Sequence, residues 1–386
     1  MNPVIQFKKI CLVCVAVLAC YGLSPALNAN TIKVTNTNDS GPGSLRAALA
    51  ATRIGDTIDA TGVSGRILLT SGALGTNSFF NNNLRIIGPG AGKLAIDGNA
   101  ASPVFKNFAR GVTISGFTIT NGLADSNGGG GIQNPGGAVL GGQVELTVTR
   151  CNVVSNRGLG ISNFANDSNQ QPGGASATLT ITDSTVSGNS RGGISNIAAA
   201  AELNGAGATV AISNSTISGN RASKGGGIYN SASGVEHNAI ATVAISNSTL
   251  SGNSAVNVNG ATIYNTSNNA PGGGRAIVTL GNTILNTSSS SHNIVGGVIS
   301  LGYNLASDDG GGFLRAGRGD RINTDPRLGP LQDNGGQTFT HALLPGSPAI
   351  NRGNPNFTPP PFHDQRGPAY HRVVNGRIDI GAFEVQ

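Results

Sequence analysis

Short apolar segments recur at a regular interval along this chain. Their clearest marker is an isoleucine followed two positions later by an asparagine, at Ile132 and Asn134, Ile161 and Asn163, Ile194 and Asn196, Ile228 and Asn230, and Ile263 and Asn265. Successive isoleucines are 29, 33, 34 and 35 residues apart. A repeat length in this range is typical of a solenoid, in which each repeat is one coil stacked on the next.

Two further apolar columns keep the same interval. One consists of Ile114, Val148, Ile181, Ile212, Ile245 and Leu280, and the other of Ile119, Val154, Val186, Ile217, Leu250 and Ile284. Each repeat thus has three short segments rich in Val, Ile and Thr, which predicts strands joined by tight turns. Like residues of successive coils would stack about 4.8 Å apart. The pattern predicts an all-β fold, a right-handed parallel β-helix with three strands per coil.

The composition fits a narrow interior. The chain has 59 Gly, no Trp and 4% aromatic residues, too few large side chains to fill a wide globular core. Disorder is the competing interpretation of so much glycine, but disordered segments have no reason to keep apolar columns in register. The formal charge of +6 includes the leader lysines Lys8 and Lys9, and the Lys and Arg residues of the repeats are scattered singly. Because no run of them could follow a phosphate backbone, we expect no nucleic-acid partner.

The amino terminus reads as an export signal. Two lysines precede an apolar run over residues 10–19, and small residues follow up to Ala29, which predicts a signal peptide over 1–29 and a secreted or cell-surface protein. The letters VLAC, which end at Cys20, also resemble a bacterial lipobox, so a lipoprotein anchored to a membrane at Cys20 is the alternative. Outside this leader the one cysteine is Cys151, interpreted as a buried filler or, alternatively, a reactive thiol.

The asparagines of the first column are interpreted as scaffold. Stacked one above another, Asn134, Asn163, Asn196, Asn230 and Asn265 can donate to and accept from one another at a bend that no sheet satisfies. After each asparagine the chain is predicted to form a long loop on one edge of the solenoid, over residues 164–178, 197–209, 231–242 and 266–277. Loops on a rigid scaffold often carry recognition, so we place any binding function there.

Candidate carbohydrate-binding residues come from these loops and the strands beside them. Tyr229 and Tyr264 are expected to project outward from adjacent coils as a sugar-stacking pair, although two ordinary surface tyrosines would give the same pattern. Glu202, Glu236 and His237 lie in the predicted loops. Metal ligands are sparse: Asp308 and Asp309 precede three glycines and are a weak calcium candidate, or a polar turn. No cofactor is expected.

Three regions resemble a known group of bacterial surface proteins. TNTNDSGPGSLRAAL at 35–49 and GDTI at 55–58 look like the head of parallel β-helix surface proteins, with Ser44 as the N-cap of a short helix that covers the open end. GGGI at 225–228 is similar to the GGAI element of chlamydial polymorphic outer-membrane proteins, which are related to autotransporter passengers. DPRLGPL at 325–331, DNGG at 333–336, TFTH at 338–341, LPGSPAIN at 344–351, DQRG at 364–367 and DIGAFE at 379–384 resemble the choice-of-anchor Q tail.

The resemblance implies a division of the chain, and more about architecture than about activity. The division is a signal peptide over 1–29, an N-terminal cap with the first strands over 30–80, β-helix repeats over 81–300 and a tail over 301–386. Asp364, Arg366 and Asp379 in the tail are expected to form charge pairs that hold it together. A monomer is expected.

Catalysis would need carboxylates on neighbouring coils. A glycosidase requires two carboxyl groups about 5–9.5 Å apart, but no outward strip of the repeats carries acids on successive coils. The motifs of polygalacturonases and pectate lyases do not occur. We therefore expect a non-catalytic surface protein that acts in adhesion or in contact with a polysaccharide or cell-surface glycan. The alternatives are a polysaccharide lyase or hydrolase with loop-borne carboxylates such as Glu202 and Glu236, and a structural envelope protein.

Overall fold

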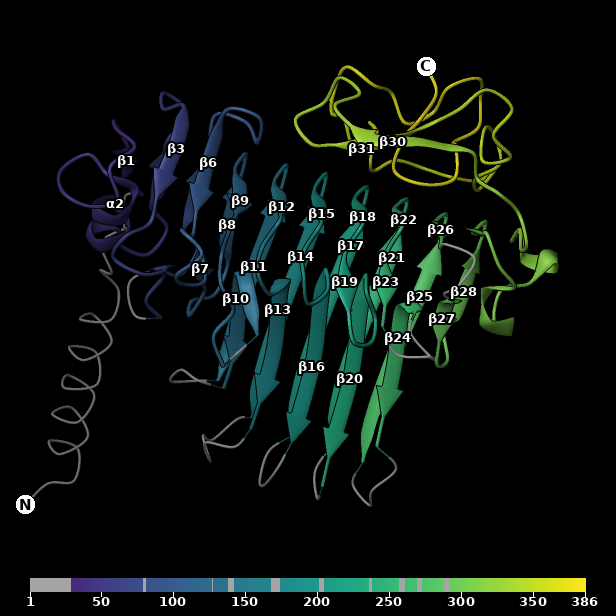
Figure 1. The fold of residues 1–386 in the computed structure, drawn as a ribbon, viewed down its shortest axis with the longest axis horizontal. Coiled ribbons are helices and arrows are strands. Elements are labelled where there is room, and N and C mark those ends of the chain that lie inside the picture. The colour runs from purple at the N-terminus through teal and green to yellow at the C-terminus, as the bar shows by residue number, and fades with distance from the viewer. Residues whose placement is uncertain are drawn as a thin grey trace, which may run out of the picture.

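The chain folds as a parallel β-solenoid (Figure 1), so the predicted fold class is confirmed. The computed structural model describes residues 29–78, 81–126, 128–137, 142–167, 174–200, 205–235, 238–256, 261–268, 273–287 and 292–386. The leader with Cys20 lies outside these residues. The predicted right-handedness stays a prediction. None of the helices within the described ranges is long and apolar enough to cross a membrane.

Three parallel sheets form the solenoid. Sheet A runs in the order β1 (Thr31–Lys33), β2 (Thr57–Asp59), β5 (Arg85–Ile87), β8 (Val112–Ser115), β11 (Gln143–Thr149), β14 (Ala175–Thr182), β17 (Ala206–Ser213), β21 (Ala239–Ser246), β25 (Gly274–Gly281) and β28 (Ile299–Gly302). Sheet B runs in the order β3 (Gly65–Leu68), β6 (Leu94–Asp97), β9 (Thr118–Thr120), β12 (Asn152–Val154), β15 (Thr185–Ser187), β18 (Thr216–Ser218), β22 (Thr249–Ser251), β26 (Ile284–Asn286) and β29 (Leu305–Ala306). Sheet C runs in the order β4 (Leu74–Gly75), β7 (Phe105–Lys106), β10 (Gly129–Gly136), β13 (Leu159–Asn166), β16 (Ile194–Ala200), β20 (Ile228–Gly234), β24 (Ala261–Ser267) and β27 (His292–Val295). The sheets thus continue to Ala306, past the boundary expected at residue 300.

Consecutive strands enter the three sheets in turn. Strands β8, β9 and β10 belong to sheets A, B and C, and β11, β12 and β13 repeat the order. Two successive coils each contain a fourth short strand between sheets B and C: β19 (Arg221–Ala222) in one and β23 (Ser254–Ala255) in the next. These two strands pair with each other. Coils with this addition have more strands than the sequence pattern predicts.

The apolar columns of sheets A and C stack as predicted. Ile132 pairs with Ile161, and the column continues in register to Ile263 with every member fully buried. Isoleucine and valine fill the interior because both fit a narrow, pleated core.

The column predicted for sheet B was wrong at two positions. Val153, not Val154, pairs with Val186 and points inward, and Leu285, not Ile284, pairs with Leu250. Successive side chains of a strand point to opposite faces, and both strands have apolar residues at adjacent positions, so the sequence did not fix the register. Ile284 faces outward and is nevertheless fully buried, because the tail covers it.

A short helix closes the amino-terminal end. Helix α2 (Leu45–Ala51) begins after Ser44, whose Oγ accepts a hydrogen bond from the Ala47 amide, as the sequence predicts. Leu45 and Leu49 are buried against the first coils and belong to the main core. The cap therefore covers apolar side chains at the first coils, which would otherwise face water.

The described residues of the loops predicted after each asparagine are mostly strand, so the prediction was wrong for these parts. Strand β16 continues to Ala200 and β17 begins at Ala206, and the neighbouring coils do the same (Figure 1). The extended parts of sheets A and C pack face to face through a second core made almost wholly of alanine: Val144, Ala165, Ala175, Ala177, Ala198, Ala200, Ala206, Ala208, Ala232, Ala239 and Ala241. We call this two-layered extension the fin.

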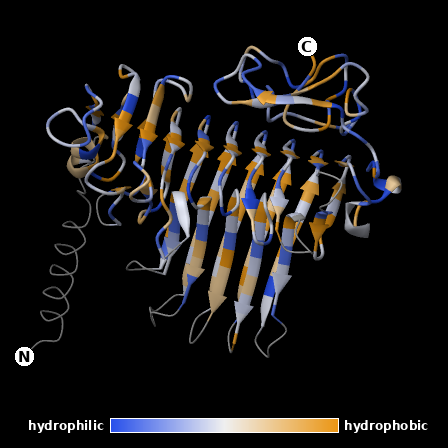
Figure 2. Ribbon diagram, viewed as in Figure 1, coloured by the Kyte–Doolittle hydropathy of each residue, from blue (hydrophilic) through white to orange (hydrophobic). Residues whose placement is uncertain are grey.

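Small side chains let the two layers of the fin approach closely. A Cβ atom at Gly136 would lie 2.2 Å from the Ser176 carbonyl oxygen, and one at Gly274 would lie 2.1 Å from that of Ala232. Hydrophobic and hydrophilic residues interleave along these strands (Figure 2), which places alanine inside and mostly Ser and Thr outside. The alternation of buried and exposed positions expected of a strand is thus present, but its buried positions are alanines.

The carboxy-terminal residues 323–386, the tail module, lie over the outer face of sheet B (Figure 1). They follow two short 3-10 helices, η1 (Gly310–Gly312) and η2 (Ala316–Arg318), and contain an antiparallel pair, β30 (Leu328–Gln332) and β31 (Thr340–Leu343). Ile284 and Leu305 of the solenoid pack with Leu343, Ala349 and Ile380 of the tail in a separate apolar cluster.

Candidate functional site

Two ladders of asparagine side chains run through the solenoid. Beside sheet C, each Nδ2 donates to the next Oδ1 at 2.7–2.8 Å along Asn107, Asn134, Asn163, Asn196, Asn230 and Asn265. After sheet B, Asn156, Asn189, Asn220 and Asn253 form a second ladder at 2.9 Å per step. No member is more than 9% exposed. Because these amides bond to one another and to backbone carbonyls, they serve the scaffold and not a ligand.

Tyr229 and Tyr264 come together on the outer face of sheet C. They lie in register on β20 and β24, between buried neighbours whose side chains point inward. Their ring centroids are 5.9 Å apart and the ring planes differ by 14°, which is an offset stack. The Lys224 ammonium lies 5.2 Å from the centroid of the Tyr264 ring. This produces a half-exposed aromatic surface with a cation at its border.

Glycines between Lys224 and Tyr229 let the backbone approach the next coil closely. A Cβ atom at Gly226 would lie 2.3 Å from the carbonyl oxygen of Ser254, and one at Gly227 would lie 2.9 Å from that of Thr262. The GGGI element therefore has a packing role, because only glycine permits the close approach of two backbones. It also holds Lys224 a few residues before Tyr229 on an exposed turn.

A groove of about 490 Å³ lies where the turns lead from sheet B into sheet C. Its walls include Leu159, Ser190, Arg191, Arg221, Ser223 and Val256, and we call it the basic groove. Sequence reasoning missed it because Arg191 and Arg221 are 30 residues apart and looked scattered. Their positions in the repeat could have revealed the groove, because Arg191 and Arg221 each follow an asparagine of the second ladder by one or two residues.

The three loop candidates Glu202, Glu236 and His237 lie outside the described residues, so the structure does not test the enzyme alternative built on them. Asp308 and Asp309 lie in a turn. The Asp308 carboxylate accepts from the Asn293 and Gly310 amides, and that of Asp309 accepts from the Gly311 amide. Within the described ranges, no three His, Cys, Asp or Glu side chains are close enough to hold a metal ion.

Cys151 lies within the core. Its side chain is fully buried, and its Sγ lies 3.3 Å from the Thr149 carbonyl oxygen. Burial raises the pKa of the thiol to about 11, because a thiolate would lose its hydration there. Both observations favour the buried-filler interpretation over a reactive thiol.

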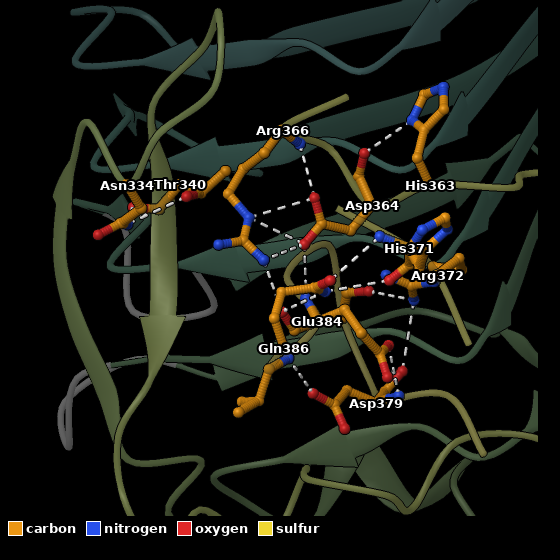
Figure 3. A network of polar contacts seen from close by, with 12 residues as sticks. Asn334, Thr340, His363, Asp364, Arg366, His371, Arg372, Asp379, Glu384 and Gln386 are labelled. Atoms are coloured by element: carbon orange, nitrogen blue, oxygen red, sulfur yellow. Dashed lines mark hydrogen bonds and ion pairs between the residues drawn. The ribbon is translucent and has the colours of Figure 1, made fainter. Parts of the chain in front are cut away.

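The tail module contains a buried network of charged side chains (Figure 3). Asp364 and Arg366 form an ion pair at 2.6 Å, and the Arg366 guanidinium lies 3.8 Å from the ring centroids of both Tyr370 and Phe383. Arg366 Nη2 also donates to the Glu384 carbonyl oxygen at 2.6 Å. The pairing of Asp364 with Arg366 agrees with the expectation from sequence.

Asp379 and Glu384 continue this network. The Asp379 carboxylate accepts from the Asn351 and Val385 amides at 2.6 and 2.7 Å, and the Glu384 carboxylate accepts from the Asp379 amide at 2.8 Å. Asp379 therefore bonds to backbone amides and does not form the charge pair that the sequence suggested. Arg372 Nη2 donates to the Gly381 carbonyl oxygen at 2.6 Å.

Burial perturbs the titration of these carboxyl groups. Loss of hydration, and secondarily the charge of Asp379, raises the pKa of Glu384 to about 8. Burial also raises the pKa of Asp379. Such shifts are common in active sites. Here Asp364, Asp379 and Glu384 are each at most 1% exposed. A substrate has no access to them, so the network stabilises the tail.

No family model matches the chain, and no curated protein matches it. Among solved structures, one titled "Crystal structure of pectate lyase Pel9A" aligns over 94% of this chain and 98% of its own, with a TM-score of 0.40 and 15% sequence identity. At this distance the match carries no inference about activity. The resemblance of the tail to choice-of-anchor Q stays a prediction.

Proposed function

We propose that this protein is a non-catalytic, exported binding protein that contacts polysaccharide through the outer face of sheet C. The observation that carries the proposal is the stacked pair of Tyr229 and Tyr264, which two successive coils hold in register beside the cation of Lys224. Aromatic rings give a large apolar contact at low cost in conformational entropy, and phenol hydroxyls add hydrogen bonds that suit a polyhydroxylated ligand.

The distribution of carboxyl groups supports a binding role over hydrolysis. Hydrolysis of a glycosidic bond needs two carboxyl groups facing one substrate. Among the described residues, the carboxylates with raised pKa are Asp183, Asp379 and Glu384. All three lie at or beneath the tail module: Glu384 and Asp379 are buried, and the backbone oxygen of Asp183 accepts a hydrogen bond from Thr338.

Export is the second part of the proposal and is supported by the leader over residues 1–29. Cleavage after Ala29 would release the solenoid from the cell, whereas acylation at Cys20 would tether it to a membrane. Either route presents sheet C to extracellular or cell-surface polysaccharide. Mass spectrometry of the protein recovered from culture medium and from membranes distinguishes the two routes.

The binding proposal is tested with the purified protein and a panel of neutral and acidic polysaccharides, by affinity electrophoresis followed by calorimetry. Replacing both Tyr229 and Tyr264 with Ala should weaken binding about 5- to 100-fold, because a ring that covers roughly 20–60 Å² of a sugar's apolar face contributes about 0.5–1.5 kcal/mol. Phe362→Ala is the matched control, since Phe362 is 71% exposed and lies in the tail module. Equal binding by the double variant and the wild type, or no binding to any polysaccharide, would refute the proposal.

A further inference from the structure

The basic groove has a charge pattern that the proposed function leaves unexplained. Three successive turns after sheet B each contain one exposed arginine: Arg157, Arg191 and Arg221. The backbone fixes their order, because the Arg191 amide donates to the Gly158 carbonyl oxygen and the Arg221 amide donates to that of Asn189. Lys224 follows Arg221 on the same turn and approaches Tyr264. The cations therefore line one edge of the solenoid in steps of one coil.

Among the described residues, no ion pair balances the positive charges of the groove. The ion pairs found in the described part of the chain involve Arg46, Arg66, Lys106 and Arg366, and none involves Arg191, Arg221 or Lys224. Neighbouring strands are about 4.8 Å apart, and like charges on adjacent strands repel. Exposed cations held on successive coils, with no ion pair to another described residue, are the arrangement expected where a ligand supplies the opposite charge.

We propose that the basic groove binds an anionic polysaccharide, with Arg191 and Arg221 contacting its carboxylate or sulfate groups and the Tyr229–Tyr264 pair contacting an adjacent sugar. This inference rests on the proposed polysaccharide-binding function and specifies its ligand class. Guanidinium groups form bidentate hydrogen bonds with carboxylate and sulfate oxygens, which gives arginine an advantage over lysine in this position. A polymer with regularly repeated anions can meet several coils at once, as a small anion cannot.

The apolar walls of the groove fit a sugar polymer better than free ions. Leu159 is half-buried and Val256 is 60% exposed, and both line the same cavity as the arginines. Sugar rings have apolar C–H faces that can cover such side chains, whereas the anionic groups reach the guanidinium groups at the rim. None of the residues lining the groove belongs to the tail module, so the tail can stay docked while a polymer binds.

The test measures binding of polygalacturonate, dextran sulfate and neutral dextran to the full protein at 20 and 300 mM NaCl. Arg191→Gln combined with Arg221→Gln is compared with Arg53→Gln combined with Arg275→Gln, which removes the same charge from exposed positions elsewhere. We expect the groove variant to bind the acidic polymers about 2- to 30-fold more weakly at low salt, from two exposed charge contacts. The control variant should match the wild type, and 300 mM NaCl should reduce the difference because it screens the charges.

The outcomes separate this inference from the function on which it rests. Groove-dependent binding of polygalacturonate alone would identify carboxylate as the recognised group, and binding of dextran sulfate alone would identify sulfate. Either result supports the basic groove as the binding site. Equal losses in the two double variants would show non-specific attraction to a basic protein and overturn the assignment. Tyrosine-dependent binding of neutral dextran with no preference for acidic polymers would overturn the inference and leave the proposed function standing. No binding to any polymer would refute both.

Discussion

Replacing Asn196 with Ala should destabilise the solenoid from the middle of its ladder. The Asn196 side chain accepts from Asn163 at 2.7 Å and donates to Asn230 at 2.8 Å. Its Nδ2 also donates to the Ala208 and Thr242 carbonyl oxygens, at 3.1 Å each. Ala retains none of these four contacts, and the side chain of Asn196 is fully buried, so water cannot replace them.

The magnitude follows from which partners keep a hydrogen bond. The Asn163 amide still has the carbonyl oxygens of Ala177 and Thr209 as acceptors, whereas Oδ1 of Asn230 loses the donor that Asn196 supplied. A buried polar group left unsatisfied costs about 1–3 kcal/mol, and each lost hydrogen bond about 1 kcal/mol. With the unsatisfied Asn230 oxygen and three other lost hydrogen bonds, we expect the free energy of unfolding to fall by about 4–6 kcal/mol, a large part of the 5–15 kcal/mol of a typical domain.

Asn265→Ala is the matched control at the end of the same ladder. Asn265 has one ladder neighbour, is 9% exposed, and leaves the Asn230 amide with the Ala241 and Ile277 carbonyl oxygens as acceptors. Its loss should cost about 1–3 kcal/mol, because water can reach part of the site. Urea unfolding followed by circular dichroism measures both variants, and hydrogen exchange of sheet C amides locates the effect. If Asn196→Ala cost less than 1 kcal/mol, or no more than Asn265→Ala, the ladder would not hold the coils together as argued.

Three further changes test other parts of the fold. Because the pKa of Glu384 is raised to about 8 from 4.5, the folded state keeps a proton that the unfolded chain loses. The contribution of Glu384 to stability should therefore be complete below pH 4.5 and be lost as pH rises through 8, by up to about 5 kcal/mol, and Glu384→Gln should flatten urea midpoints measured between pH 5 and 8. Cys151 should react with a thiol reagent only after unfolding, and reaction in native buffer would contradict its burial. In the fin, Ala208→Leu should cost at least about 1–3 kcal/mol in urea unfolding through overpacking, whereas the outward neighbour change Thr209→Leu should be nearly neutral, and equal effects would argue against the alanine core.

The repeat predicted most of the solenoid because its signal is carried by large apolar residues that recur at fixed intervals. The columns through Ile132 and Ile114 stack as predicted, since a strand with one apolar face has one favourable register. At Ile284 the prediction failed because the outward face is also apolar, and it is apolar because the tail packs on it. The sequence of a repeat does not reveal which face a distant module will cover.

The fin and the basic groove escaped prediction for a related reason. Alanine is a weak marker of burial, so the alternation at Ala206 and Ala208 read as loop, although small side chains are what two closely packed sheets require. Arg191 and Arg221 are brought together only by the register of the coils. The columns of large apolar residues could be predicted because each residue marks its own burial. The alanine core and the pair of arginines could not, because they are defined by which residues of other coils lie beside them.

The arrangement of the faces explains why burial raises the pKa of the carboxyl groups in the tail module. Sheet B presents rows of Thr and Ser that resemble an open polar surface, but the tail occupies them: Thr185 donates to the Phe339 carbonyl oxygen at 2.6 Å, and Thr216 donates to Gln365 at 2.6 Å. Because the tail packs against sheet B, Glu384 and Asp379 are buried, and burial raises their pKa values. The same cover leaves the edge between sheets B and C open, where Arg191, Arg221 and Lys224 form no ion pair with any described residue and Lys224 lies beside the tyrosine stack. In our proposal, stability and recognition thus occupy different faces of one solenoid: the buried charges of the tail module hold it on sheet B, whereas the exposed arginines beside sheet C are the ones that a ligand can reach.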